Sequence, residues 1–219
     1  MNIEGFLSQL SIWAIPALFA ITMHEASHGY VARIFGDDTA WRAGRVSLDP
    51  LRHIDPVGTV LLPLLFLFLS GGRIIFGYAK PVPVDFTKLR HPKKDMLWVA
   101  LAGPLANFLM AFFWRFVMTL SEWLLDAGTT SWIWQVAQVG IIFNLLLMLF
   151  NLVPVPPLDG GRVLVSLLPR KQAYYIANIE PYGILILLVL LVTGVLWVVL
   201  LPIFFVLLQL FGVNLEVPS

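Results

Sequence analysis

Two histidines and a glutamate stand together at positions 24 to 28, in the pattern H-E-x-x-H. On a helix, His24 and His28 are four residues apart and project from one face, so both imidazoles can bind one Zn²⁺. Glu25 lies beside them and can take a proton from a water molecule that the metal activates. A catalytic zinc also needs a third protein ligand and an open position for water. The sequence therefore predicts one zinc ion per chain, with one ligand supplied from elsewhere.

Asp159 is the best-placed candidate for the third ligand. It closes a proline-rich run over residues 153–161, which reads V-P-V-P-P-L-D-G-G. The prolines end the preceding helix because they cannot donate a backbone hydrogen bond. The carboxylate then lies on irregular backbone, which is tolerated at membrane depth only inside protein or beside a water-filled cavity. The alternative is that Asp159 caps a short helix beginning near Gly160. Beside H-E-x-x-H, we favour the ligand.

The composition indicates that these residues are held in a membrane. Hydrophobic residues make up 59% and charged residues 12% of the 219 positions, against about 45–50% and about 25% in soluble domains. The net charge of +1 argues against a nucleic-acid partner. The absence of cysteine excludes disulfides, thiolate metal sites and cysteine nucleophiles.

Five stretches without Asp, Glu, Lys or Arg predict the elements that position the site. They span residues 5–24, 56–72, 96–114, 127–158 and 181–215. A helix needs about 20 apolar residues to cross a bilayer. We expect an all-α polytopic membrane protein with about four to six transmembrane helices and a small membrane-associated β or re-entrant element.

We expect a single intramembrane domain over residues 1–219, without an appended soluble domain. Its predicted parts are core helices over about 7–34, 96–120 and 132–152, a re-entrant segment over 57–72, a Leu-Asp-Gly segment over 151–168, and a C-terminal helix or hairpin over 181–213.

Basic residues predict the direction of insertion. Ten Lys and Arg residues fall in 33–94 and three in 159–178, whereas 1–32 and 122–131 have none. The positive-inside rule then places the two basic regions in the cytoplasm. His24 precedes Arg33 by nine residues, or about 14 Å of helix. We therefore expect a site inside the membrane that opens toward the cytoplasm.

With H-E-x-x-H in one apolar helix and Leu-Asp-Gly at the end of a later one, the sequence resembles the site-2 proteases. Further segments that carry the resemblance are 36–37 (GD), 44–48 (GRVSL), 53–56 (HIDP), 77–84 (GYAKPVPV) and 102–107 (AGPLAN). They are similar to the compact bacterial and archaeal branch without a PDZ domain. The resemblance implies zinc ligands at His24, His28 and Asp159, with Glu25 as the catalytic residue.

The resemblance also implies a function and a location. The protein would be a zinc metalloendopeptidase of a bacterial or archaeal cell membrane, and it would hydrolyse peptide bonds in or near transmembrane segments. Its partners would be a transmembrane protein substrate and the lipid bilayer. The sequence names no regulatory partner.

Two further features are candidate substrate contacts. Asn107, which the resemblance places with Gly103 in a G-x-x-x-N motif, either donates to a substrate carbonyl or developing oxyanion, or joins helices. The segment 76–84 reads as an extended edge strand, because its prolines lack the N–H that a ladder needs. Such a strand could guide substrate by strand addition, and the alternative is a plain interfacial loop. The residues concerned are Gly77, Tyr78, Ala79, Lys80, Pro81 and Val82.

Other polar residues near the apolar stretches are expected to have structural roles or to be solvated. Asn144 and Asn151 are predicted to be structural. His53 and Asp55 either support or replace a metal ligand, or form an interfacial turn before a proline, and we favour the turn. His91, beside two lysines, is expected to be solvated.

A metal or proton transporter is the main alternative function, because His and Asp residues in a membrane can bind a passing ion. A transporter more often shows a repeat or paired broken helices in its two halves, and the sequence contains neither. A catalytically dead scaffold is a third reading. The intact Glu25 argues against it, since metal binding alone does not require that residue.

Overall fold

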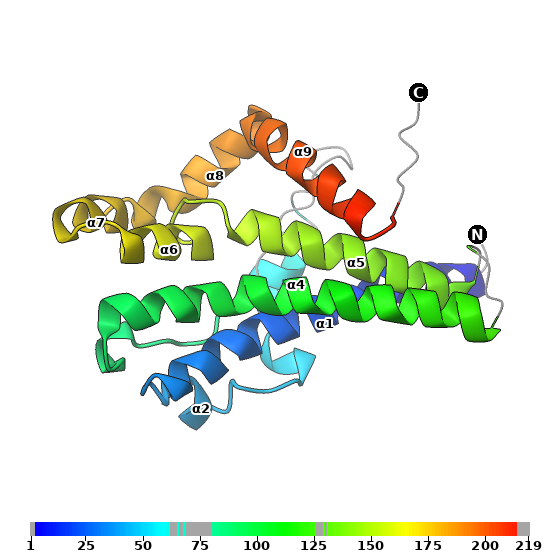
Figure 1. Ribbon diagram of the computed structural model, residues 1–219, viewed down its shortest axis with the longest axis horizontal. Helices are drawn as coiled ribbons and strands as arrows, with labels where there is room; N and C mark the ends of the chain where they lie inside the picture. Colours follow the sequence, from blue (N-terminus) through cyan, green and yellow to red (C-terminus); the bar gives the residue numbers. More distant parts are fainter. Residues whose placement is uncertain are drawn as a thin grey trace.

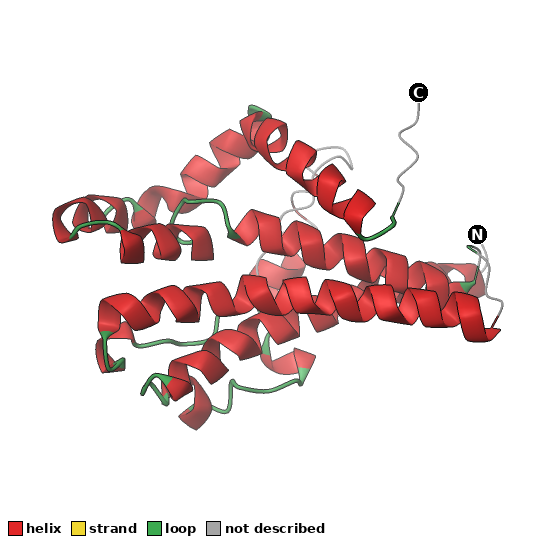
Figure 2. Cartoon of the chain, in the orientation of Figure 1, coloured by secondary structure: helices red, strands yellow, loops and turns green. Residues whose placement is uncertain are grey.

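The computed structural model describes residues 3–61, 65, 68, 80–125, 129 and 131–213. Within these ranges the chain is helical and contains no strand (Figure 2). Its three longest helices are α1 (Ile3–Ile34), α4 (Pro92–Leu125) and α5 (Trp132–Asn151). Helix α4 packs against both of the others, and α1 also contacts α5, so the three form one bundle (Figure 1).

Shorter elements connect and extend this bundle. They are α2 (Thr39–Arg42), η1 (Pro50–Arg52), η2 (Pro56–Leu61), η3 (Phe86–Lys88), α6 (Asp159–Leu167), α7 (Arg170–Ala177), η4 (Glu180–Tyr182), α8 (Gly183–Val192) and α9 (Val195–Leu210). Helices α8 and α9 contact each other, and the chain turns between them at Gly194. Its φ of +78° lies in the left-handed region that glycine adopts without strain.

Four helical stretches are long and apolar enough to cross a membrane: 3–34, 92–124, 132–151 and 170–192. The apolar helix α9 is shorter. Large apolar side chains stay exposed on these helices; Phe116 and Val198 are 63% and 75% exposed. Such a surface suits lipid rather than water. The predicted all-helical membrane class is confirmed, with four candidate spans.

The predicted β element is not supported. The described part of that segment, Lys80–Val84, has no regular secondary structure, and residues 69–79 lie outside the described ranges. Pro81 and Pro83 have no N–H to give to a neighbouring strand. The Val82 N–H bonds to the Glu25 side chain, and the Lys80 N–H bonds to the His53 carbonyl in a loop, so neither pairs with a strand.

The prediction of a re-entrant segment over 57–72 is tested only at its start. There the structure describes the short π-helix η2, and of the following residues only Leu65 and Phe68. The rest of that prediction lies outside the described residues.

The centre of the bundle combines large apolar side chains with close helix approach. Met118 on α4 and Ile141 and Leu145 on α5 are at most 1% exposed. Gly140 lies against the Trp114 ring so closely that a Cβ there would stand 2.4 Å from a ring atom. Small residues allow membrane helices to approach in this way. The tight contact fixes the register between α4 and α5.

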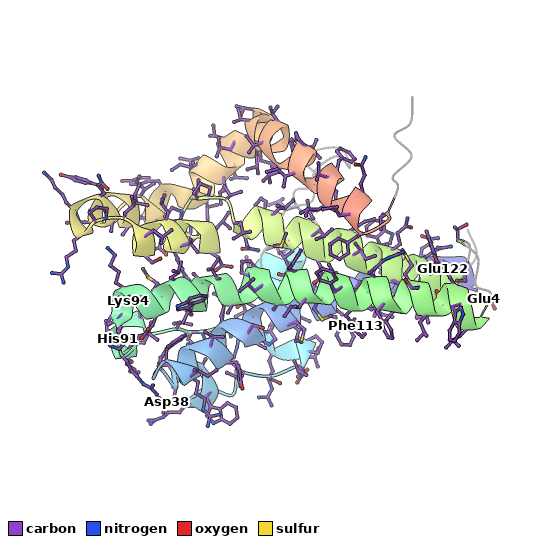
Figure 3. The ribbon with its side chains drawn as sticks, in the orientation of Figure 1. Glu4, Asp38, His91, Lys94, Phe113 and Glu122 are labelled. Atoms are coloured by element: carbon purple, nitrogen blue, oxygen red, sulfur yellow. The ribbon has the colours of Figure 1, made fainter. Side chains whose placement is uncertain are left out.

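The charged ends of the bundle are separated (Figure 3). Glu4 and Glu122 lie at one end, and Asp38, His91 and Lys94 lie at the other. Helices α1 and α4 therefore run in opposite directions, so the end of α1 and the start of α4 lie at the same end of the molecule. At that end Arg33 stacks on the Trp41 ring, with its guanidinium carbon 3.5 Å from the ring centroid.

Candidate active site

Two helices bring the candidate ligands together. His24 and His28 lie one turn apart on α1, and Asp159 is the first residue of α6. Their Nε2 and carboxylate oxygen atoms all lie within 4.8 Å of one another. Residues distant in sequence thus meet inside the bundle, where each is at most 7% exposed.

The distances among these atoms are short and nearly equal. His24 Nε2 is 3.1 Å from Asp159 Oδ2, and His28 Nε2 is 3.3 Å from the same oxygen. The two Nε2 atoms are 3.1 Å apart. Ligand atoms bound tetrahedrally to one zinc lie about 3.3–3.4 Å from each other, given Zn–N and Zn–O bonds of about 2.0–2.1 Å. The triangle fits a single metal ion.

The hydrogen bonds of the two imidazoles decide what this triangle can hold. His28 Nδ1 lies 2.7 Å from the Val99 carbonyl, and His24 Nδ1 lies 2.6 Å from Asn107 Oδ1. Both partners are acceptors, so each Nδ1 must carry the proton. In a neutral imidazole the Nε2 atom is then a bare lone pair. In that form three acceptor atoms face one another, and one bound metal ion would satisfy all three.

Gly103 on α4 provides the space beside this triangle. A Cβ at that position would stand 2.4 Å from His28 Nε2 and 2.6 Å from His24 Nε2. The helix backbone can therefore approach the imidazole edges that carry the lone pairs. The candidate metal centre therefore requires a residue without a side chain at the glycine position of the G-x-x-x-N motif.

Close backbone packing also places Asp159. A Cβ on Gly160 would lie 2.2 Å from the Leu152 carbonyl oxygen, and one on Gly161 would lie 2.3 Å from the Pro156 nitrogen. The start of α6 can thus fold back against the end of α5 and the proline loop. Leu158 occupies the N-cap position of α6, and no side chain caps the helix there. The Asp159 carboxylate instead faces the two histidines, as a ligand would.

Glu25 has a backbone partner. Its Oε2 accepts a hydrogen bond of 2.8 Å from the Val82 amide. Pro81 and Pro83 on either side have no amide hydrogen, so this sequence presents a single N–H in three residues. The bond holds one of the two carboxylate oxygens of Glu25 in place.

The segment that carries Val82 is fixed at both ends. The Lys80 amide donates to the His53 carbonyl at 3.0 Å, and the Arg45 guanidinium donates to the Lys80 carbonyl at 2.8 Å. At the other end the Asp85 amide donates to the fully buried Asp37 carboxylate at 2.7 Å. These bonds give Val82 a defined place beside Glu25.

Asp85 also begins η3. Its side chain accepts from the Thr87 hydroxyl and amide, and these hydrogen bonds lower the pKa of the Asp85 carboxyl below its ordinary value. The N-cap therefore stays ionised at neutral pH.

Asn107 lies against His24 and is fully buried. Its amide nitrogen lies 3.1 Å from the Ala20 carbonyl oxygen and 2.9 Å from Asn144 Oδ1, so both amide hydrogens have partners. A bond to substrate would require one of these to open. The oxyanion role of Asn107 stays a prediction.

The other predicted residues lie at different places. Gly77, Tyr78 and Ala79 are outside the described residues. His53 is 2% exposed and shares its Nε2 proton with the Ser47 carbonyl, away from the metal-ligating group. His91 is exposed at the start of α4.

Sequence reasoning missed three partners of the site. They are the Val82 amide, the Val99 carbonyl and the Asn144 side chain. The sequence Pro81-Val82-Pro83 contains a signal for the Val82 amide, because Val82 is the only one of the three residues with a backbone N–H. No sequence signal distinguishes the Val99 carbonyl from its neighbours.

Comparison with known proteins identifies the family. The model of peptidase family M50 matches residues 13–194. YwhC of Bacillus subtilis, which is named as a candidate zinc metalloprotease, is 39% identical over 85% of this chain and 83% of its own length. Rip2 of Mycolicibacterium smegmatis, named in the same way, is 29% identical over 80% of this chain and 64% of its own length. No solved structure matches the chain.

The chain therefore belongs to peptidase family M50, and the resemblance to the site-2 proteases is confirmed. It is a zinc metallopeptidase of the membrane. No comparison favours the transporter alternative.

Replacement of Gly103 by Ala should weaken zinc binding. The added methyl group would stand well inside contact distance of both Nε2 atoms, so an imidazole must turn away from the centre. We expect a loss of affinity of about tenfold or more, measured by competition with a chelator. Ala111→Val, two turns further along α4 in the buried core, serves as the matched control. It should lower thermal stability without changing zinc affinity; equal affinity loss in both variants would contradict the steric role of Gly103.

Replacement of Val82 by Pro should lower turnover because it deletes the N–H that holds Glu25. Loss of one aligned donor to a catalytic group typically costs about 10²-fold or more in kcat. Val82→Ala keeps the N–H and removes only side-chain packing, so it should retain most activity. Similar rates for the two variants would show that the backbone bond does not orient the base. Peptide cleavage in detergent, with zinc content checked, measures the difference.

Proposed function

We propose that His24, His28 and Asp159 hold the zinc of this peptidase and that Glu25 is its general base. The observation that carries this proposal is the convergence of two imidazole lone pairs and one carboxylate oxygen without a donor among them. Glu25 follows the first ligand directly in α1. One residue set thus supplies both a metal centre and a nearby base.

Zinc, when bound, polarises a scissile carbonyl and lowers the pKa of water. The chain's own residues then handle the proton. Glu25 takes it from the attacking water and delivers it to the leaving amine nitrogen. The Val82 amide holds Oε2 during this exchange, so Oε1 is the oxygen that carries the proton. The Nδ1–H groups of His24 and His28 donate to Asn107 Oδ1 and to the Val99 carbonyl oxygen, which turns both Nε2 atoms toward the metal centre.

The substrate we propose is a transmembrane segment of another membrane protein. The two histidines come from a long apolar helix, and all three proposed ligands are nearly covered, so access from bulk water is restricted. A regular helix hides its carbonyls in its own hydrogen bonds. Cleavage therefore requires a segment with helix-weakening residues, which can present an extended stretch to the site.

We further propose that the site opens to the cytoplasm of a bacterial or archaeal cell. The end of α1 and the start of α4, which flank the basic region of the sequence, lie at one end of the bundle, and the positive-inside rule assigns that end to the cytoplasm. Residues 1–219 would then act as one intramembrane domain. Water would reach Glu25 from the cytoplasmic end.

Glu25→Gln should abolish proteolysis while keeping the fold and the zinc. The amide retains the size of the side chain but cannot take a proton. Cleavage of a single-pass transmembrane substrate should fall by several orders of magnitude, since base and zinc act as one unit. Metal analysis of the same sample provides the control. A variant that cleaves at a near wild-type rate would overturn the mechanism, and zinc flux into liposomes without any cleavage would favour transport.

Cysteine scanning should report a cytoplasmic opening, and the native chain has no thiol to interfere. Ser27→Cys and Leu158→Cys flank the candidate ligands in sequence. In oriented vesicles, a water-soluble thiol reagent should reach both only from the cytoplasmic side. Trp123→Cys, at an 80% exposed position near the opposite end, should react only from the other side. The reverse labelling pattern would invert the proposed topology.

A further inference from the structure

A chain of side-chain hydrogen bonds runs from α5 to the candidate metal centre. The Asn144 amide nitrogen donates to the Gly140 carbonyl at 2.8 Å, and Asn144 Oδ1 accepts from the Asn107 amide at 2.9 Å. Asn107 Oδ1 in turn lies 2.6 Å from His24 Nδ1. Both asparagines are fully buried. The chain therefore joins three helices without contact with solvent.

Two backbone carbonyls fix the polarity of this chain. A carbonyl oxygen only accepts, so the Asn144 atom that faces Gly140 must be the NH₂ group. Its oxygen then faces Asn107. The Asn107 atom near the Ala20 carbonyl must likewise be NH₂, which turns the Asn107 oxygen toward His24. The orientation of each side-chain amide is therefore fixed by the backbone carbonyl that its NH₂ group faces.

The direction of these hydrogen bonds determines which nitrogen of His24 carries the proton. With the Asn107 oxygen as acceptor, His24 carries its proton on Nδ1 and presents a bare Nε2 to Asp159 and His28. If Asn107 turned over, its NH₂ would face Nδ1, and the proton would move to Nε2, where it blocks metal binding. Two hydrogen bonds of the Asn107 NH₂ group oppose this rotation of the amide. One goes to the Ala20 carbonyl, and the other goes to Asn144 Oδ1.

We propose that Asn144 is a positioning residue for the metal centre: it locks the Asn107 amide and thereby keeps His24 in the tautomer that binds zinc. This inference rests on the proposed role of His24 as a ligand. It assigns Asn144 a function in place of the structural role predicted from sequence. Asn144 acts through Asn107 and touches neither the ligands nor the substrate.

The test is a double-mutant cycle on zinc affinity, measured by chelator competition on the full chain in detergent. Asn107→Ala should weaken zinc binding by about 10- to 100-fold, as expected for the direct partner of a ligating histidine. Asn144→Leu, which removes both ends of the amide, should weaken it by about tenfold. The double variant should bind no more weakly than Asn107→Ala alone, because Asn144 has no other route to the metal.

Nitrogen-15 NMR of His24 in metal-free protein gives a second readout. The wild type should show the Nδ1–H tautomer, and Asn144→Leu should show a mixture with Nε2–H. Asn144→Asp keeps an oxygen toward Asn107 and, when protonated, an O–H toward Gly140. It should retain zinc affinity within about threefold of wild type. This variant decides the question if Asn144→Leu does not fold.

Ser121→Ala is the matched control, because it removes a buried polar group that bonds only within α4. It should leave zinc affinity unchanged. Wild-type affinity in Asn144→Leu, or additive losses in the double variant, would overturn the positioning role. His24→Ala, measured alongside, separates failure of the proposed ligand set from failure of the positioning role of Asn144. If His24→Ala binds zinc like wild type, the proposed ligand set is wrong. If it loses zinc while Asn144→Leu does not, only the positioning role of Asn144 is wrong.

Discussion

Three atoms that can each bind a metal ion meet in the apolar interior of the bundle, and the Nδ1 partners of both histidines turn their Nε2 atoms toward one point. The Nε2 atoms of His24 and His28 and a carboxylate oxygen of Asp159 lie 3.1–3.3 Å from one another. Without a cation, such an arrangement is costly because buried lone pairs repel and cannot reach water. A positive charge at this point would relieve that cost, which supports the proposal that the zinc of this peptidase binds here.

The architecture supplies the conditions that this centre needs. One helix contributes two proposed ligands at i and i+4, and α6 brings the third proposed ligand because two glycines let its start fold onto the proline loop. Helix α4 approaches closely at Gly103 and carries Asn107 into contact with His24. Around this centre the bundle presents apolar side chains to lipid. The site is therefore the polar centre of an otherwise apolar structure.

Much of the site could be predicted from local patterns. The spacing of His24 and His28 defines one helix face whatever the rest of the fold, and a carboxylate after a proline run is conspicuous in an apolar chain. Composition alone indicated a helical membrane protein. What sequence could not provide is the relation between helices. The Val99 carbonyl and Asn144 reach the site only through the register of α4 against α1 and α5, which packing determines.

The strand expected over 76–84 shows the same limit. Extended backbone was a reasonable expectation from two prolines and alternating valines, but strand pairing depends on a partner ladder. In the described part, Val82 gives its N–H to Glu25 and the Lys80 carbonyl accepts from Arg45. The prolines that exclude a regular strand leave the Val82 N–H as the donor to Glu25, the proposed base.

The central claim is that His24, His28 and Asp159 together hold one zinc ion. Its most direct test is the zinc content per folded chain of wild type and of the three single alanine variants, with His53→Ala as the control. One zinc per wild-type chain is expected, with a sharp loss in each of the three variants and full occupancy in the control. Full zinc in Asp159→Ala together with loss in His53→Ala would contradict the assignment.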